Sequence, residues 1–113
     1  MSSINLAVVG GKVGETGTIG KSGTGEEVTN FTVLAEETRK ERGTGKPRRV
    51  AEWHRITAYG ELAQVAADLA KGTVLTVQGR FQHNRRIERG VAQHSIDIIA
   101  EKIDVIFVPK QRA

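Results

Sequence analysis

The sequence lacks cysteine: none occurs among its 113 residues. A disulfide framework and a thiolate metal site are therefore excluded, and stability must come from packing and subunit association. No apolar run approaches the roughly 20 residues of a membrane span, and the short apolar run at residues 4–9 has no basic segment before it. The sequence therefore predicts neither a membrane span nor an export signal, and it is compatible with a reducing cytoplasm.

Motifs for catalysis and for metal binding are missing as well. Residues 20–22 read GKS, but a phosphate-binding loop needs glycine five positions before Gly20, where Glu15 stands. The histidines, His54, His83 and His94, lie on different predicted elements and lack the paired spacing of a zinc site. No serine, histidine and acid form a nucleophile signature. We therefore expect no enzyme, no metal and no cofactor.

Aromatic residues are scarce, at 4%, and Trp53 is the single tryptophan. Hydrophobic residues make up 38% of the chain, enough for one packed core, so we expect one domain over residues 1–108 and a short polar tail over 109–113. Seventeen lysines and arginines against thirteen acidic residues give a net charge of +4. This charge fits a polyanionic partner, although a solvated basic surface would have the same charge.

The periodicity predicts strands over residues 4–9, 28–35, 50–59, 73–81 and 95–108. Leu62, Val65, Ala66 and Leu69 fall at helical spacing, which predicts one helix over residues 61–71, ended by Gly72. The glycine-rich residues 10–25 favour bends or a strongly curved strand. The polar residues 36–49 are expected to be an exposed β-hairpin tip, and residues 83–90 a polar hairpin connection.

This order of elements is that of a mainly β protein. Three strands, a short helix and two more strands are typical of the five-stranded OB-fold Greek-key barrel, with the helix between strands three and four. The third strand places Trp53, Arg55 and Tyr59 on one face. Aromatic rings beside arginine suit base stacking and phosphate contact. The alternative is a half-buried strand in which Trp53 belongs to the core.

Residues 52–72, EWHRITAYGELAQVAADLAKG, resemble the signature region of bacterial single-stranded DNA-binding proteins. The segments INLAVVGG, VTNFTVLA and VLTVQGRF extend the resemblance over nearly the whole chain. It implies an OB-fold protomer, usually in a homotetramer, that binds single-stranded DNA irrespective of sequence in replication, recombination or repair. A cytoplasmic, nucleoid-associated location follows from it, and a dimer is our second choice of assembly.

The resemblance also implies roles for individual residues. Trp53 occupies a stacking position, Tyr59 stands where the family commonly has phenylalanine, and Arg39 and Arg86 stand where other members have tryptophan. Each lost aromatic removes about 1–3 kcal/mol of stacking, so we expect weaker or more salt-sensitive binding. Family members carry a long tail with an acidic, hydrophobic tip, whereas this sequence ends at Ala113, so recruitment of repair enzymes by that route is not expected.

The predicted DNA site combines stacking by Trp53 and Tyr59 with a track of basic side chains for the phosphates. The basic residues are Arg39, Lys40, Arg42, Lys46, Arg48, Arg49, Arg55, Arg80, Arg85, Arg86 and Arg89. Two other interpretations fit the same residues: an RNA-binding or primosome-accessory OB protein, and an OB module that contacts an acidic protein partner.

Overall fold

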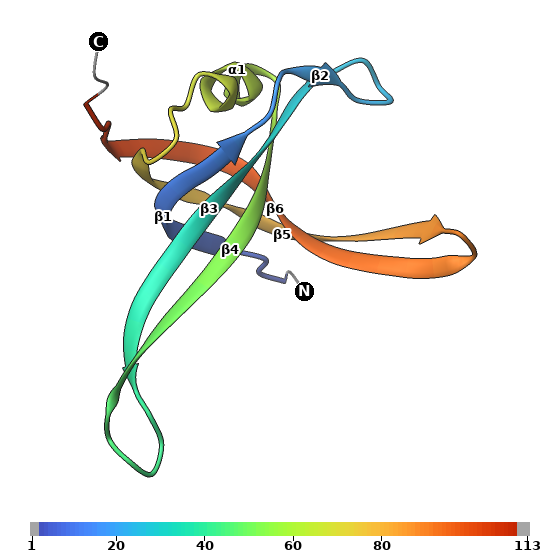
Figure 1. The fold of residues 1–113 in the computed structure, drawn as a ribbon. Helices are drawn as coiled ribbons and strands as arrows, with labels where there is room; N and C mark the ends of the chain where they lie inside the picture. The colour runs from blue at the N-terminus through green and yellow to red at the C-terminus, as the bar shows by residue number, and fades with distance from the viewer. Residues whose placement is uncertain (1–2, 111–113) are drawn as a thin grey trace.

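Five long, curved strands close into a barrel in the computed structural model, which describes residues 3–110 (Figure 1). They are β1 (Ala7–Thr16), β3 (Glu27–Lys40), β4 (Pro47–Tyr59), β5 (Val74–Glu88) and β6 (Val91–Phe107), and a two-residue strand, β2 (Gly20–Lys21), pairs with β3. The long strands follow one another around the barrel as β1, β5, β6, β4 and β3, and the pairing of β1 with β3 closes it. The prediction of a mainly β, five-stranded OB barrel is confirmed, and the last three residues of the expected tail lie outside the described residues.

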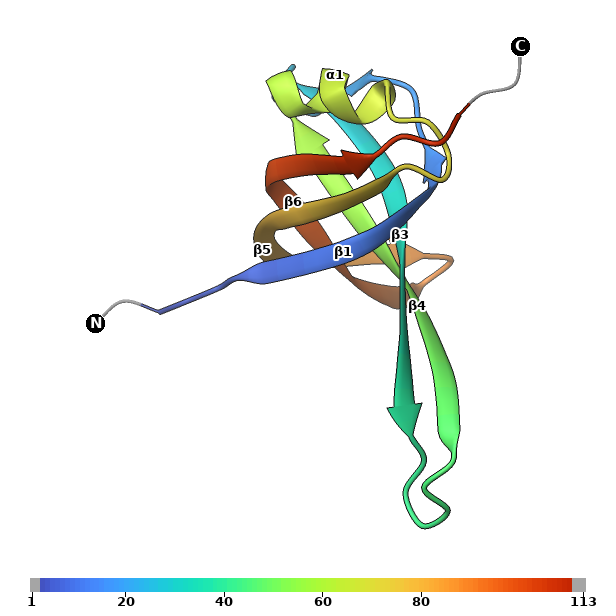
Figure 2. The ribbon, with the colours of Figure 1, turned by 90° about the vertical axis from the view of Figure 1, so that its left-hand side faces the viewer.

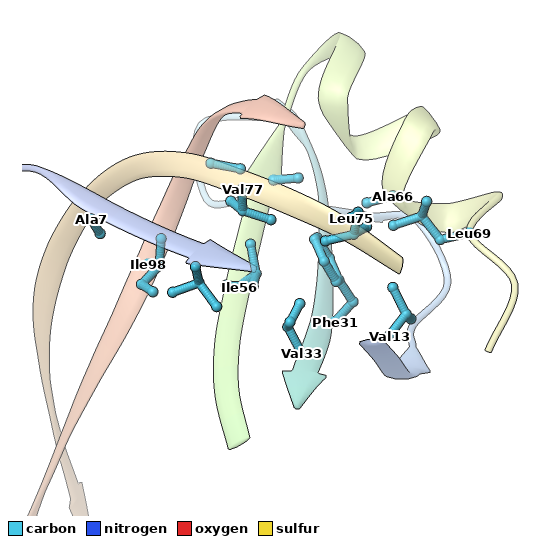
Figure 3. Close-up of a cluster of buried hydrophobic side chains, with 13 residues drawn as sticks. Ala7, Val13, Phe31, Val33, Ile56, Ala66, Leu69, Leu75, Val77 and Ile98 are labelled. Carbon is cyan, nitrogen blue, oxygen red and sulfur yellow. The ribbon is translucent and has the colours of Figure 1, made fainter. Parts of the chain in front are cut away.

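The core fills the barrel with side chains from alternate positions of its strands (Figure 3). Phe31 and Val33 point inward from β3, and Leu75 and Val77 do so from β5. Ile56 of β4 completes the centre of this cluster. Because these positions alternate with more exposed ones, the sequence period of two predicted this part of the fold.

Helix α1 (Glu61–Ala67) covers one end of the barrel and ends four residues before the predicted position. In a longer helix the carbonyl oxygen of Ala66 would accept from the amide of Ala70. Here it accepts instead from the Leu69 amide at 3.2 Å and from the Thr16 hydroxyl at 2.7 Å. The barrel therefore satisfies the end of the helix, and the chain turns away before Gly72. No helix in the described part of the chain is long and apolar enough to cross a membrane.

Strand β1 begins later and ends later than predicted, at Ala7 and Thr16 instead of residues 4 and 9. It pairs with β5 up to Lys12 and then with β3, and so changes partner along its length. This course brings Gly11 close to β3, where a Cβ atom would lie 2.8 Å from the carbonyl carbon of Leu34. The glycines that suggested bends therefore permit a continuous curved strand.

Two hairpins extend beyond the barrel in different directions (Figures 1 and 2). We call residues 36–51 the β3–β4 arm and residues 83–96 the β5–β6 arm. Residues 36–49 form the exposed hairpin that was predicted, with strand pairing that continues to Lys40 and Pro47. The prediction that residues 83–90 are a connection was wrong for most of their length, because strand pairing continues to Glu88 and Val91. A two-stranded ribbon exposes both faces to solvent, so most positions of the arms are polar, while Ile87, Val91 and Ile96 of the β5–β6 arm are exposed apolar residues.

Candidate nucleic-acid interface

Trp53 lies on the outside of the barrel, with 60% of its surface exposed. It comes from β4 and stands opposite Leu34 of β3. Its ring packs against Gly14 of β1, where a Cβ atom would lie 2.7 Å from ring atom Cη2 and 2.9 Å from Oγ1 of Thr32. The structure therefore places Trp53 at the surface and not in the core, and β1 supports the ring.

Arg55 lies two residues further along the same side of β4, about 7 Å from Trp53 along the strand. It lines a groove of about 390 Å³ between β4 and the β5–β6 arm. The other residues of this groove are Asn84, Arg85, Arg86, Glu88, Gln93, His94, Ser95 and Asp97. Three of the predicted arginines thus meet at one groove, beside the exposed tryptophan. We call it the arginine groove.

A second basic surface covers the tip of the β3–β4 arm. Arg39 and Arg48 stand directly opposite each other, with Lys40 next to them at the last paired position. Arg39 forms an ion pair with Glu37, and Arg49 forms one with Glu36. Four basic residues of this arm form no ion pair with any residue of the described segment 3–110: Lys40, Arg42, Lys46 and Arg48. This surface can attract an anionic chain.

The remaining predicted site residues lie elsewhere. Tyr59 is half-buried; it is the last residue of β4, just before α1, at the opposite end of the strand from the tip of the β3–β4 arm. Arg80 belongs to β5 beyond Gln78, which stands beside Val8 of β1, and it does not line the arginine groove. Arg89 forms the turn at the tip of the β5–β6 arm with a φ of 51°. None of the three lines the arginine groove.

The sequence did not reveal several residues of this surface. Asn84 and Asp97 are joined by a hydrogen bond of 2.6 Å inside the arginine groove, and the packing of Gly14 against Trp53 was not predicted. His83 and His94 lie on different elements, as predicted, but their rings stack with centroids 5.0 Å apart, and Nε2 of His83 lies 3.1 Å from Nδ1 of His94. The sequence did not indicate this contact, because it depends on the pairing of β5 with β6 through residues expected to be a connection.

Two named proteins are similar to this chain in sequence. The chain is 31% identical over 106 residues to two proteins named "Single-stranded DNA-binding protein", from Neisseria meningitidis serogroups A and B, and the match covers 92% of this chain and 60% of each relative. The chain therefore spans about three fifths of the length of these relatives.

Solved structures agree with this fold. A structure described as the Plasmodium falciparum SSB complex with ssDNA superposes with a TM-score of 0.81 at 26% identity, covering 96% of this chain and 98% of the other. The single-stranded DNA-binding protein from Thermus aquaticus, as a deletion mutant, gives a TM-score of 0.79 at 21% identity, covering 92% of this chain and 51% of the other. The second comparison bears on the fold alone.

The family itself is settled by a match that extends over most of the chain. Residues 4–106 match the Single-strand binding protein family, and the resemblance inferred from residues 52–72 is confirmed. The chain belongs to the Single-strand binding protein family.

Proposed function

We propose that this protein binds single-stranded DNA irrespective of base sequence and holds it during replication, recombination or repair. The observation that carries the proposal is the position of Trp53, an exposed ring packed on Gly14 beside the arginine groove. A supported ring keeps one face open for a base, and the adjacent arginines can neutralise phosphates. Family membership supports this partner.

The proposed path of the DNA starts at the arginine groove. There a base stacks on Trp53 while Arg55, Arg85 and Arg86 contact phosphates. The strand then extends along the β3–β4 arm, where its basic residues add charge contacts: Arg39, Lys40, Arg42, Lys46, Arg48 and Arg49. Tyr59, Arg80 and Arg89 bind only a strand long enough to continue around the barrel or to reach the tip of the β5–β6 arm.

Charge contributes more to this interface than stacking does. Trp53 is the one tryptophan of the sequence, and Arg39 and Arg86 stand where the resemblance leads us to expect aromatic rings. Each phosphate neutralised on a single strand contributes about 0.7 to the slope of log K against log salt. We therefore expect affinity to fall steeply with salt.

We propose that the protein assembles as a homotetramer, with a dimer as the alternative. Ile4, Leu6 and Val8 are exposed around the start of β1. The edge of β1 from Ala7 to Gly11 that faces away from β5 is unpaired in residues 3–110. An unpaired edge flanked by apolar side chains is suited to pairing with a second copy. Light scattering coupled to size exclusion would give the mass, and a monomeric mass would reject both assemblies.

The test of the function is a fluorescence titration of Trp53 with oligothymidine at several salt concentrations. We expect strong quenching by the single strand, little response to duplex DNA of the same length, and a steep salt slope. A matched RNA oligomer competes in a separate arm, and preference for it would favour the RNA-binding alternative. No binding to single strands at low salt would reject the proposal and favour an OB module for protein contacts. If the protein binds single-stranded DNA, we expect it to co-localise with the nucleoid in the cytoplasm.

A further inference from the structure

An acidic residue lies inside the arginine groove at the point where the two arms diverge. Strands β4 and β6 pair in parallel there, with Ile56 opposite Ile98. Arg55 and Asp97 precede these two residues and therefore stand side by side. The Nε atom of Arg55 lies 3.8 Å from Oδ1 of Asp97.

The Asp97 carboxylate is held firmly in place. Its side chain is only 8% exposed, and its Oδ2 accepts a hydrogen bond of 2.6 Å from Nδ2 of Asn84. Asn84 in turn accepts a hydrogen bond of 3.2 Å from Gln82. The other carboxylate oxygen, Oδ1, is buried without a hydrogen-bond partner in the part of the chain that the structure describes. Arg55 is therefore the charged group that compensates this buried oxygen.

A buried carboxylate in this position is unfavourable for a groove that binds a polyanion, unless it performs another task. The second acid of the groove, Glu88, differs because its side chain is 59% exposed, 3.8 Å from Arg86, and can turn toward solvent. Asp97 cannot turn away, since the backbone and Asn84 fix it. Its negative charge remains beside any phosphate that enters.

We propose that Asp97 is a positioning residue, which holds the guanidinium of Arg55 in the orientation that binds a DNA phosphate. Asp97 faces the Nε atom, so the two terminal nitrogens of the planar guanidinium remain for the phosphate. The Arg55 side chain is 52% exposed and would otherwise sample many rotamers. This inference rests on the proposed binding of single-stranded DNA.

The substitution Asp97→Asn tests the role because the two explanations predict opposite signs. Removal of a negative charge alone should strengthen DNA binding. If Asp97 orients Arg55, D97N instead weakens binding to oligothymidine about threefold to tenfold at 0.1 M salt, as expected for loss of one charge-assisted contact. The slope of log K against log salt should also fall by about 0.7, the value for one phosphate. Glu88→Gln, which removes the exposed acid of the same groove, is the matched control and should bind more tightly.

The weakening of DNA binding by D97N must also depend on Arg55. In an Arg55→Ala background, D97N should no longer weaken binding. An equal loss in both backgrounds, or tighter binding by D97N alone, would overturn the inference while leaving DNA binding by the unaltered protein intact. Failure of the unaltered protein to bind would overturn the function as well.

A second variant decides the question if D97N does not fold, as judged by thermal unfolding. Arg55→Lys keeps the charge of an exposed side chain but removes the planar group that Asp97 orients. It should weaken binding several-fold more than Arg85→Lys, because Arg85 has no ion-pair partner in segment 3–110. Equal losses in the two lysine variants would overturn the role of Asp97.

Discussion

The ring of Trp53 rests directly on Gly14, so that β1 supplies the surface beneath the proposed base-stacking residue. A Cβ atom on Gly14 would lie 2.7 Å from ring atom Cη2, well inside contact distance. Any larger residue at this position must displace the ring or shift β1. The lack of a side chain at Gly14 therefore determines where the Trp53 ring lies.

Replacing Gly14 by alanine should displace the Trp53 ring and weaken single-stranded DNA binding by about 1 kcal/mol, a fraction of the 1–3 kcal/mol that base stacking contributes. The measurement is the fluorescence titration with oligothymidine, together with the emission maximum of the free protein, which should shift to the red. Gly10→Ala is the control on the same strand, because its Cβ would make only an ordinary contact, 3.5 Å from Thr76. Equal affinities of the two variants would contradict the prediction, as would an effect of Gly14→Ala that persists in a Trp53→Ala background.

The β3–β4 arm offers a prediction in which stability and binding change in opposite directions. Arg48 stands directly opposite Arg39, and like charges at such a pair are unfavourable. Arg48→Glu should therefore stabilise the fold by about 0.5 kcal/mol while it weakens DNA binding and lowers the salt slope. Thermal unfolding and titration measure the two effects.

Lys71→Glu is the control for this variant, since it makes the same change of net charge on an exposed residue after α1, away from both arms. It should change the salt slope little. Similar slopes for the two variants would indicate that net charge, and not the arm, attracts the DNA.

Much of the barrel could be predicted because its core follows simple periods. Phe31 and Val33 alternate with more exposed neighbours, as do Leu75 and Val77, and such alternation requires a strand with one buried face. The helix was predicted from its spacing, but its end was not, because the Thr16 hydroxyl that binds Ala66 comes from another part of the chain.

The arms and the groove were harder to predict for a different physical reason. In residues 36–51 and 83–96 both faces meet solvent, so the period of two carries no hydrophobic signal and the strands resemble polar loops. The meeting of Arg55 with Asp97 depends on the parallel pairing of β4 with β6, which joins segments about 40 residues apart. Residue types alone suggested which basic and aromatic side chains contact DNA. The contacts of the supporting residues Gly14, Asn84 and Asp97 depend on the closed barrel, so they could not be predicted from the sequence.

Two buried threonines should respond differently to the same isosteric substitution. The Thr29 hydroxyl donates a 2.8 Å hydrogen bond to the carbonyl oxygen of Ala63 in α1, whereas the Thr73 hydroxyl is buried with no partner in the described residues. Thr29→Val should lower the free energy of unfolding by about 1 kcal/mol, because the hydrogen bond that joins β3 to α1 is lost. Thr73→Val should be neutral or stabilising. Urea unfolding of both variants checks the prediction, and equal losses would show that packing and not hydrogen bonding decides the effect.

Gly79 lies where the pairing of β5 with β6 shifts register, between Gln78 and Gly79. A Cβ atom there would lie 2.9 Å from the carbonyl carbon of Ile99 and 3.2 Å from Cα of Ala100. These are backbone atoms, which cannot rotate away as a side chain can, so Gly79→Ala must push β5 and β6 apart. We expect the free energy of unfolding to fall by about 2 kcal/mol or more, at the level of overpacking in a core.

Gly23→Ala provides the comparison for this last variant, since a Cβ there meets nothing within 4 Å. It should leave stability unchanged or raise it by up to about 1 kcal/mol, because alanine restricts the unfolded chain. Urea unfolding midpoints give the difference in stability between the two variants.

Because a register shift of this kind bends the strands that carry it, Gly79→Ala should also misdirect the β5–β6 arm and weaken DNA binding, which titration with oligothymidine measures. Unchanged stability in Gly79→Ala would mean that the two strands can separate locally at little cost, and the direction of the arm would then have to be set by the parallel pairing of β4 with β6.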